Sequence, residues 1–429
     1  MTDACLFREA NVFDGRSATL IERADVLVEG DTITAVHQGR LDIAEGVTIV
    51  ECGGRTLMPG LIDLHTHPSF NLPVDRTTDA SLWLRGMSLA KTLEMYLAQG
   101  FTTIRETGGA CTAETALACD RGLVAGPRLY PSGAFLSQTS GHGDFRRPQA
   151  PHPSMTACCG DISQGGFSYL VDGPDEVRKA ARENLHRGAT QLKIMAGGGV
   201  ASPVDPIHTT QFRPEEIRAA VEVAEDWGTY VTAHLYHDRS ARRCIENGVR
   251  CIEHGHLLSD ETVAMCADLG IPIVGQAVTY TVMSEIGSEM GLGAGNLSKN
   301  TEILQQFGHL FGLIRERGVR IGFSSDLIGG QQHQVNREFV LRKPYFSNLE
   351  ILRQATAESA DILRLCGPLD RYGRFGEVRE GWLADLIVVD GNPLDDVGLL
   401  EDHARRLLVI MKGGRIYKDL SDGNHPPRP

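Results

Sequence analysis

Residues 58–67 read Met-Pro-Gly-Leu-Ile-Asp-Leu-His-Thr-His, an apolar stretch that ends in two histidines one residue apart. Alternate residues of a strand share a face, so His65 and His67 are expected to point the same way. Two imidazoles buried side by side are costly unless something binds them, and a divalent metal does so. A structural role explains a single pair of this kind equally well. Whether the pair binds metal therefore depends on the residues of the other predicted strands.

The alternation of strand and helix continues through residues 59–373. Apolar or alternating runs predict strands at 61–67, 102–107, 128–132, 191–196, 230–236, 251–254, 271–278 and 319–326. Helical patterns lie at 82–99, 174–187, 214–227, 239–247, 260–269, 301–317 and 348–365. This rhythm predicts an α/β protein, a (β/α)8 TIM barrel. A doubly wound open sheet is the main alternative, but the glycine run at 197–199 lacks the spacing of a dinucleotide-binding fingerprint.

The two chain ends have a different texture from the middle. Residues 1–58 and 374–420 read as short strands separated by turns, and we expect them to pair into one composite β-sandwich. Residues 421–429 are expected to be a flexible tail. Two Gly-rich stretches, 137–173 and 280–298, interrupt the barrel pattern and are predicted to be long functional loops.

Composition excludes several classes of protein. The chain has 42 Lys+Arg and 55 Asp+Glu, a net charge of −13, which disfavours a nucleic-acid partner. The absence of a signal-peptide pattern and of a long apolar run argues against a membrane and for a cytoplasmic location. Ten cysteines without C-x-x-C spacing are expected to be reduced and buried.

Further polar residues occupy the ends of later predicted strands. His234 lies near the end of the fifth strand, His254 of the sixth, and Asp326 closes the eighth. Each alone is compatible with a structural histidine or a helix-capping aspartate. Barrel enzymes keep their chemistry at the C-terminal strand ends, so the group as a whole predicts a metal site.

Lys193 lies within the fourth predicted strand, where Leu192 and Ile194 are expected to face the helices and Lys193 the barrel axis. A buried ammonium beside a metal dication is electrostatically unfavourable. Carbamylation by CO₂ turns the side chain into an anionic carboxylate that can bridge two metals. The alternative is an ion pair with a barrel carboxylate such as Glu106.

This order of residues resembles the metal-dependent amidohydrolase superfamily. Residues 58–67 resemble its N-terminal motif, and residues 381–389 resemble its return into the β-sandwich. Three segments resemble the imidazolonepropionase-related branch, which contains prolidase-like Xaa-Pro dipeptidases, carboxypeptidases and ochratoxin-hydrolysing members; they are residues 140–144, 232–236 and 251–255. Ser324 and Ser325 depart from the commoner Gly-Thr before the aspartate, and His237 replaces a small polar residue.

The resemblance implies two divalent metal ions, zinc by default with manganese or cobalt as alternatives. It assigns His65, His67 and Asp326 to one metal, His234 and His254 to the other, and carbamylated Lys193 and a hydroxide as bridges. The hydroxide attacks an amide while Asp326 moves the proton to the leaving amine. His142 is implied to contact the scissile carbonyl oxygen, and Tyr236 the substrate's terminal carboxylate.

The implied reaction is hydrolysis of the C-terminal amide bond of dipeptides, Xaa-Pro or similar, or of N-acyl amino acids such as ochratoxin. The substrate is therefore a small molecule or dipeptide, and a homo-oligomer is expected. The alternatives are a cyclic-amide or imidazolone hydrolase and a non-catalytic assembly protein related to hydantoinases. Other polar residues have structural explanations at least as good as functional ones: Arg105, Glu106, Arg146, Arg147, His208, His256 and His333.

Overall fold

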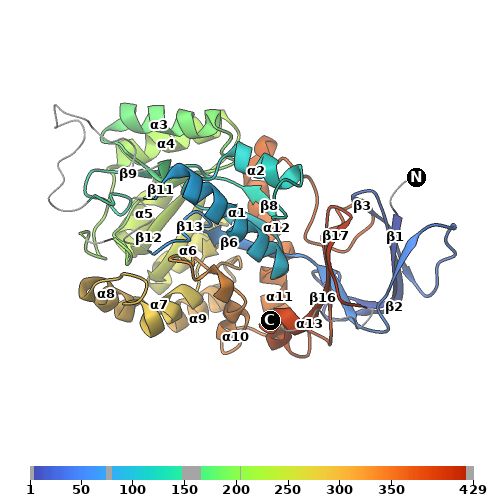
Figure 1. Cartoon of the computed structure of the whole chain (residues 1–429). Coiled ribbons are helices and arrows are strands. Elements are labelled where there is room, and N and C mark those ends of the chain that lie inside the picture. Colours follow the sequence, from blue (N-terminus) through green and yellow to red (C-terminus); the bar gives the residue numbers. More distant parts are fainter. Residues whose placement is uncertain (1–3, 74–79, 147–165, 203, 422–429) are drawn as a thin grey trace.

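The two chain ends meet in a sheet domain that lies at one side of a helix-wrapped barrel (Figure 1). The computed structural model describes residues 4–73, 80–146, 166–202 and 204–421. Most of the predicted tail at 421–429 lies outside them. The boundaries at residues 58 and 374 stay predictions.

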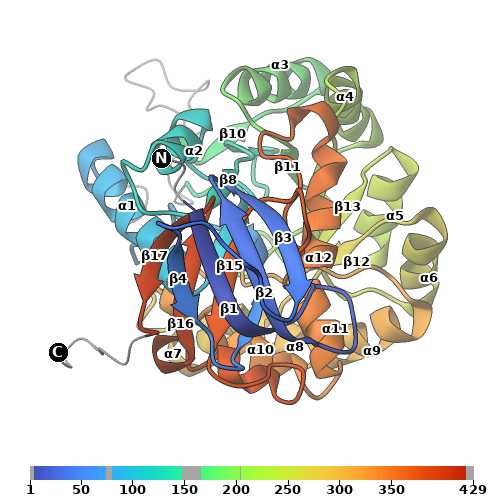
Figure 2. The same cartoon turned by 90° about the vertical axis from the view of Figure 1, so that its right-hand side faces the viewer.

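The sheet domain has eight strands in the order β17-β16-β15-β5-β1-β2-β3, with β4 paired to β1. Five come from the N-terminal end: β1 Ala4–Val12, β2 Ile21–Glu29, β3 Thr32–Gln38, β4 Thr48–Glu51 and β5 Thr56–Pro59. Three come from the C-terminal end: β15 Leu386–Val389, β16 Leu407–Lys412 and β17 Arg415–Asp419. The antiparallel β5–β15 pair joins the two ends, and Figure 2 shows blue and red strands side by side. The prediction of a β domain built from both ends is confirmed.

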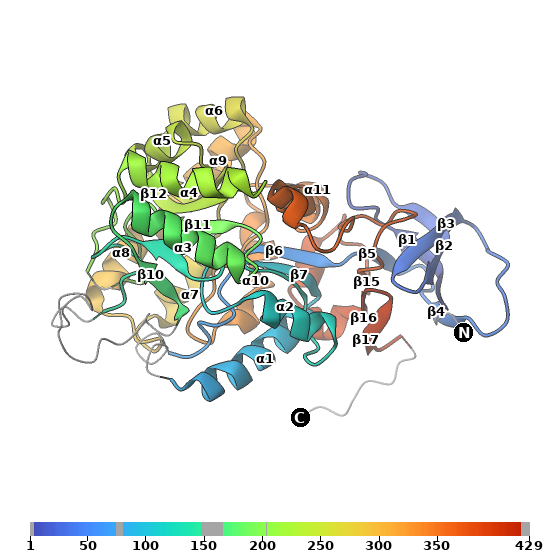
Figure 3. The ribbon, with the colours of Figure 1, turned by 90° about the horizontal axis from the view of Figure 1, so that it is seen from above.

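The barrel consists of parallel strands wrapped by helices, as predicted. Its strands are β6 Leu61–Thr66, β7 Phe101–Glu106, β8 Arg128–Tyr130, β9 Phe135–Ser137, β10 Ser168–Leu170, β11 Leu192–Met195, β12 Val231–His237, β13 Cys251–Leu257 and β14 Ile273–Val274. Figure 3 shows β6 leading from the sheet domain into the barrel. The predicted strand at 128–132 is shorter than expected, since Pro131 has no N–H and Gly133 has a φ of 72°.

Helices surround these strands, apart from α13, which lies between β15 and β16 of the sheet domain; six of the thirteen described helices (α1, α3, α4, α5, α6 and α11) begin within one residue of a predicted start. They are α1 Leu82–Ala98, α2 Ala113–Asp120, α3 Pro174–His186, α4 Pro214–Asp226, α5 Asp238–Glu246, α6 Asp260–Leu269, α7 Val278–Ile286, α8 Ala294–Leu304, α9 Phe307–Arg317, α10 Arg337–Arg342, α11 Asn348–Gln354, α12 Ala357–Leu363 and α13 His403–Arg406. Within the described part of the chain, no helix is long and apolar enough to cross a bilayer.

The segment 319–326, predicted from the sequence as the eighth and last barrel strand, is not a regular strand. A single parallel bridge joins Ile321 to Ile273 of β14. On the other side, the amide of Leu64 in β6 donates to Phe323 O at 2.8 Å, and the amide of Asp326 donates to His65 O at 2.8 Å. These sparse bonds still close the ring between β14 and β6, and they hold Asp326 beside His65.

Three predictions about the late helices are wrong. The single helix predicted at 301–317 is two helices, α8 Ala294–Leu304 and α9 Phe307–Arg317. The stretch at 280–298 contains most of α7 and the start of α8, because Tyr280, Val282 and Met283 are buried at helical spacing despite the surrounding Gly and Ser. The helix predicted at 348–365 breaks after Gln354. Its freed Ala355 carbonyl accepts a 2.8 Å bond from the Ile62 amide of β6, so barrel closure competes with helix continuation.

A buried ion pair holds the barrel against the sheet domain. Asp385, just before β15, accepts two bonds from Arg128 of β8, at 2.7 and 3.1 Å, and a third from the Gly413 amide at 2.7 Å. Both side chains are largely buried.

We predict that Asp385→Ala lowers the free energy of unfolding by about 3 kcal/mol, because it leaves the Arg128 charge buried without its partner. The control is Asp390→Ala, which breaks the exposed pair with Arg406 and should cost less than about 1 kcal/mol. Urea unfolding of both variants measures the difference. Equal midpoints would mean that the pair does not join the domains.

Candidate metal centre

The residues predicted to bind metal converge at one end of the barrel. His65 and His67 come from the end of β6, Lys193 from β11, His234 from β12 and His254 from β13. Asp326 follows the irregular eighth strand. All are buried except Asp326, whose side chain is 15% exposed.

His65, His67 and Asp326 form the first group. The two Nε2 atoms lie 3.2 Å apart, and Asp326 Oδ1 lies 3.4 Å from that of His65 and 3.1 Å from that of His67. His65 Nδ1 lies 2.7 Å from Glu253 Oε2, and His67 Nδ1 lies 2.8 Å from Gly108 O. Because these oxygens only accept, both Nδ1 atoms carry protons, so each ring in its neutral form presents a lone pair at Nε2.

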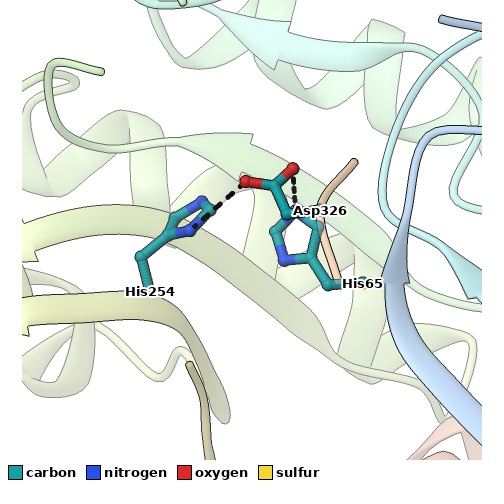
Figure 4. Close-up of side chains that lie close together, drawn as sticks. All are labelled: His65, His254 and Asp326. Carbon is teal, nitrogen blue, oxygen red and sulfur yellow. Dashed lines mark ion pairs between the residues drawn. The ribbon is translucent and has the colours of Figure 1, made fainter. Parts of the chain in front are cut away.

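Three acceptor atoms therefore face one another in a buried space: two imidazole nitrogens and a carboxylate oxygen. Such an arrangement is repulsive by itself and favourable around a cation. His65, His254 and Asp326 also offer ligand atoms that all lie within 4.8 Å of one another (Figure 4). This buried group is consistent with metal binding.

His234 and His254 form the second group. His234 Nδ1 lies 2.8 Å from His254 Nε2, and His234 Nε2 donates to Gly198 O at 3.1 Å. That bond leaves the lone pair of His234 on Nδ1, directed at the His254 ring. Asp326 Oδ2 lies 3.8 Å from His254 Nδ1, so the carboxylate stands between the two groups.

Lys193 is completely buried, and its Nζ has no hydrogen-bond partner among the described residues. The alternative pairing with Glu106 does not occur, since Glu106 accepts from the Ser132 amide instead. Burial lowers the pKa of Lys193 to about 8, although Glu253 and Asp326 favour its charged form. An unpartnered amine with a lowered pKa is unusual in a barrel interior and suited to a modification that requires the neutral form.

Burial also keeps the imidazoles neutral. It lowers the pKa of His65 to about 4 and those of His234 and His254 well below the ordinary value, with Lys193 acting in the same direction. Burial alone would raise the pKa of Asp326, but His65, His67 and Lys193 hold it below its usual range. The site therefore presents neutral nitrogen donors and an ionised carboxylate, the forms that bind metals.

Two of these residues have left-handed backbone conformations. His254 has a φ of 69° and Asp326 a φ of 53°, which L side chains rarely adopt. The turn at His254 directs both Glu253 and His254 toward the centre, although neighbours in a regular strand alternate. Strain of this kind persists where the surrounding structure overrides it, often at functional sites.

The two residues predicted to contact substrate lie against the second group. The His142 ring stacks on His234 with centroids 4.1 Å apart and an interplanar angle of 13°. The Tyr236 ring stacks on His254 at 5.1 Å, and its hydroxyl lies 3.0 Å from that of Tyr280. Their roles stay predictions.

Several residues around the centre were not predicted. Glu253 accepts bonds from Arg105 at 2.5 Å, from His65 and from Thr232, so Arg105 belongs to a buried pair. Gln276 Nε2 donates to Asp326 Oδ2 at 3.0 Å and lies 2.7 Å from His254 Nδ1. Gln276 could have been predicted from the sequence, because it lies near the end of the strand predicted at 271–278.

The remaining polar residues fit the structural explanations. His208 is exposed and pairs with Glu302 at 2.9 Å, and Arg146 pairs with Asp144. His333 is exposed, whereas His256 is buried with Nε2 2.8 Å from Gln276 O. Arg147 lies outside the described residues.

Known proteins resemble this chain over most of its length. A profile of the amidohydrolase family matches residues 56–416. The chain belongs to the amidohydrolase family. Ochratoxinase from Aspergillus niger is 30% identical over 379 residues, covering 84% of this chain and 75% of that protein. Imidazolonepropionase from Bacillus velezensis is 23% identical over 372 residues, 84% of this chain and 81% of that protein.

A solved structure of similar fold is a prolidase complexed with N-methylphosphonate-L-proline. It is 36% identical, has a TM-score of 0.90, and covers 97% of this chain and 100% of that chain. The branch identified from the sequence, with ochratoxinase, imidazolonepropionase and prolidase among its members, is confirmed.

We predict that Glu253→Gln weakens zinc binding about 10- to 100-fold. Arg105 and Thr232 both donate to Oε1, so oxygen stays there and the amide nitrogen faces His65 Nδ1. The His65 proton then moves to Nε2, which can no longer bind a cation. Competition with a chelating dye measures the affinity.

The matched control is Glu338→Gln. Glu338 forms an equally buried ion pair with Arg342 and otherwise accepts bonds from the backbone of Ala277 and Val278. It should lose comparable stability and keep its zinc affinity. Equal affinities in the two variants would contradict the positioning role of Glu253.

Proposed function

We propose that this amidohydrolase is a binuclear metal-dependent hydrolase of the C-terminal amide bond of dipeptides, Xaa-Pro or similar, or of N-acyl amino acids of the ochratoxin type. The observation that carries the proposal is the Lys193 amine, buried without a hydrogen-bond partner among the described residues. Desolvation lowers the pKa of such an amine and so enlarges its neutral fraction, the form that is nucleophilic toward CO₂. The resulting carbamate would supply two further oxygens to the space between the histidine groups.

The donor set fits two divalent cations. His65 and His67 would hold one cation with Asp326, and His234 and His254 would hold the other, with carbamylated Lys193 shared by both. The Nε2 atoms of His65 and His67, 3.2 Å apart, and the 2.8 Å approach of His234 Nδ1 to His254 Nε2 support this division. Imidazole and carboxylate ligands suit zinc, and manganese or cobalt also bind such sites.

The bound cations would supply Lewis-acid polarisation of the amide carbonyl and a lowered pKa for the attacking water. Asp326 is ionised and lies between the two groups, so it can accept the proton of that water and deliver it to the leaving nitrogen. His142, stacked on His234, can donate to the developing oxyanion. Tyr236 can donate its hydroxyl to the terminal carboxylate of the substrate.

The substrate class rests on the relatives. The prolidase of similar fold binds a phosphonate derivative of proline, and ochratoxinase is the relative whose name points to an N-acyl amino acid. Both point to an amide whose nitrogen belongs to an amino acid. Imidazolonepropionase is a more distant relative, and a buried lysine that can bridge two metals favours the amide substrates.

We predict that Lys193→Ala reduces the metal content from about two to about one divalent ion per chain and lowers kcat/KM at least about 100-fold. The reason is that the bridging carbamate is lost. Elemental analysis of protein from zinc-replete cells gives the metal content.

The matched control is Lys412→Ala, another buried lysine, whose Nζ donates to Gly126 O at 2.6 Å far from the histidines. It should keep both metal ions. Wild-type turnover in Lys193→Ala, or less than one metal per wild-type chain, would refute the binuclear proposal.

We further predict that a panel of Xaa-Pro and Xaa-Arg dipeptides and N-acyl-phenylalanines contains substrates, with free amino acid released from the C-terminal side. Ninhydrin detection or mass spectrometry of the products measures cleavage. Exclusive cleavage of cyclic amides or imidazolones would instead assign the alternative function.

A further inference from the structure

The triglycine run Gly197–Gly199 follows β11 and passes directly against two histidines of the site. Gly198 O accepts the bond from His234 Nε2 at 3.1 Å. A Cβ at Gly199 would lie 2.0 Å from the Cε1 atom of His142, so any side chain at position 199 would displace the His142 ring. The backbone of this loop therefore shapes the space in which the His142 ring lies.

Two polar residues of the same loop approach His142 from its Nδ1 side. Ser202 Oγ lies 2.8 Å from His142 Nδ1, and Ser202 Oγ donates to Asp205 Oδ1. Since the hydroxyl proton goes to the carboxylate, Oγ accepts from His142, and His142 carries its proton on Nδ1. Ser202 and Asp205 are 0% and 3% exposed, so water does not compete.

Asp205 also supports the backbone of His142. Gln211 donates to Asp205 Oδ2 at 3.1 Å, and Gln211 Oε1 accepts the His142 amide at 2.9 Å. Gly199 N donates to the same carboxylate oxygen at 3.0 Å. Burial opposes ionisation of Asp205, yet the bonds from His142 and Ser202 and the nearby Lys299 hold its pKa below the ordinary value.

Helix α8 fixes this loop. Lys299 Nζ donates to the carbonyls of Gly199, Ser202 and Asp205, at 2.6, 2.9 and 3.1 Å. Asn296 Nδ2 donates to Val200 O at 2.6 Å and to Ser202 O at 2.9 Å. An ammonium whose three donors are used on one loop holds the loop in a single arrangement.

We propose that Ser202 and Asp205, clamped by Lys299, are positioning residues that fix the tautomer and ring orientation of His142. With Nδ1 protonated and bonded to Ser202, the Nε2 edge is the one left for a ligand. Nε2 accepts in the neutral ring and donates to an oxyanion only when the ring takes up a second proton, and Asp205 Oδ2, 3.6 Å from Nδ1, faces the resulting charge. An orienting carboxylate that acts through a histidine affects the transition state more than substrate binding. The inference rests on the proposed function only for the role of His142 in turnover.

The first test is Ser202→Ala, which removes the acceptor for His142 Nδ1 with little change in volume. We expect kcat to fall about 10- to 100-fold, with KM within about twofold and the metal content unchanged. The control is Ser359→Ala, a buried serine whose hydroxyl donates to Gln354 O on the barrel wall. Asp205→Asn should also lower kcat and leave KM and the metal content unchanged. Its control is Asp25→Asn, which changes an equally buried carboxylate in the sheet domain.

A double-mutant cycle separates positioning from general structural damage. If Ser202 acts through His142, the variant His142→Ala with Ser202→Ala is no slower than His142→Ala alone. A full additional loss in the double variant would overturn the proposal, as would Ser202→Ala with the activity of the Ser359→Ala control.

The second test does not depend on turnover. Nitrogen-15 NMR of metal-free protein labelled at histidine, with the His142 signals assigned through His142→Ala, reports which ring nitrogen is protonated. We expect protonated Nδ1 in the wild type and loss of this preference in Ser202→Ala. An unprotonated Nδ1 in the wild type would overturn the relay even in an active enzyme, whereas the expected spectrum in a protein that cleaves no amide would refute the proposed function alone.

Discussion

The arrangement of the barrel interior depends on one constraint: several hydrogen-bond acceptor atoms face one another in a buried space. The Nε2 atoms of His65 and His67 and a carboxylate oxygen of Asp326 converge within 3.4 Å of one another. Without a cation such a group is repulsive, and a cation makes it favourable. The surrounding strands must therefore hold the group against its own repulsion.

A buried ion pair and several buried hydrogen bonds provide that support. Arg105 and Glu253 cross the barrel interior and fix the His65 ring. Asp63 accepts the amides of His65 and Ser325, which ties β6 to the irregular eighth strand. Burial raises the pKa of Asp63 to about 7, so its ionised form depends on these bonds. The same hydrogen bonds thus close the barrel and hold the site residues in place.

Much of the fold was predictable because its signals are local. Two-residue periodicity identified β6, β12 and β13, and the proline at the start of α3 and α4 marked where those helices begin. Predictions failed where a distant segment decided the outcome. The helix at 348–365 breaks because the Ala355 carbonyl bonds to β6, and burial of Tyr280 makes a helix of an apparent loop.

The sequence by itself determined which residues end the barrel strands, and their order along the chain, because parallel strands bring their carboxyl ends to one face. It therefore identified His65, His67, His234, His254 and Asp326 as neighbours, and alternation along the fourth strand turned Lys193 toward the same axis. Only the tertiary structure decided which lone pairs face each other, that Glu253 orients His65, and that Ser202 and Asp205 reach His142. The physical reason is that periodicity is a property of one segment, whereas a hydrogen-bond partner depends on chain packing between segments far apart in sequence.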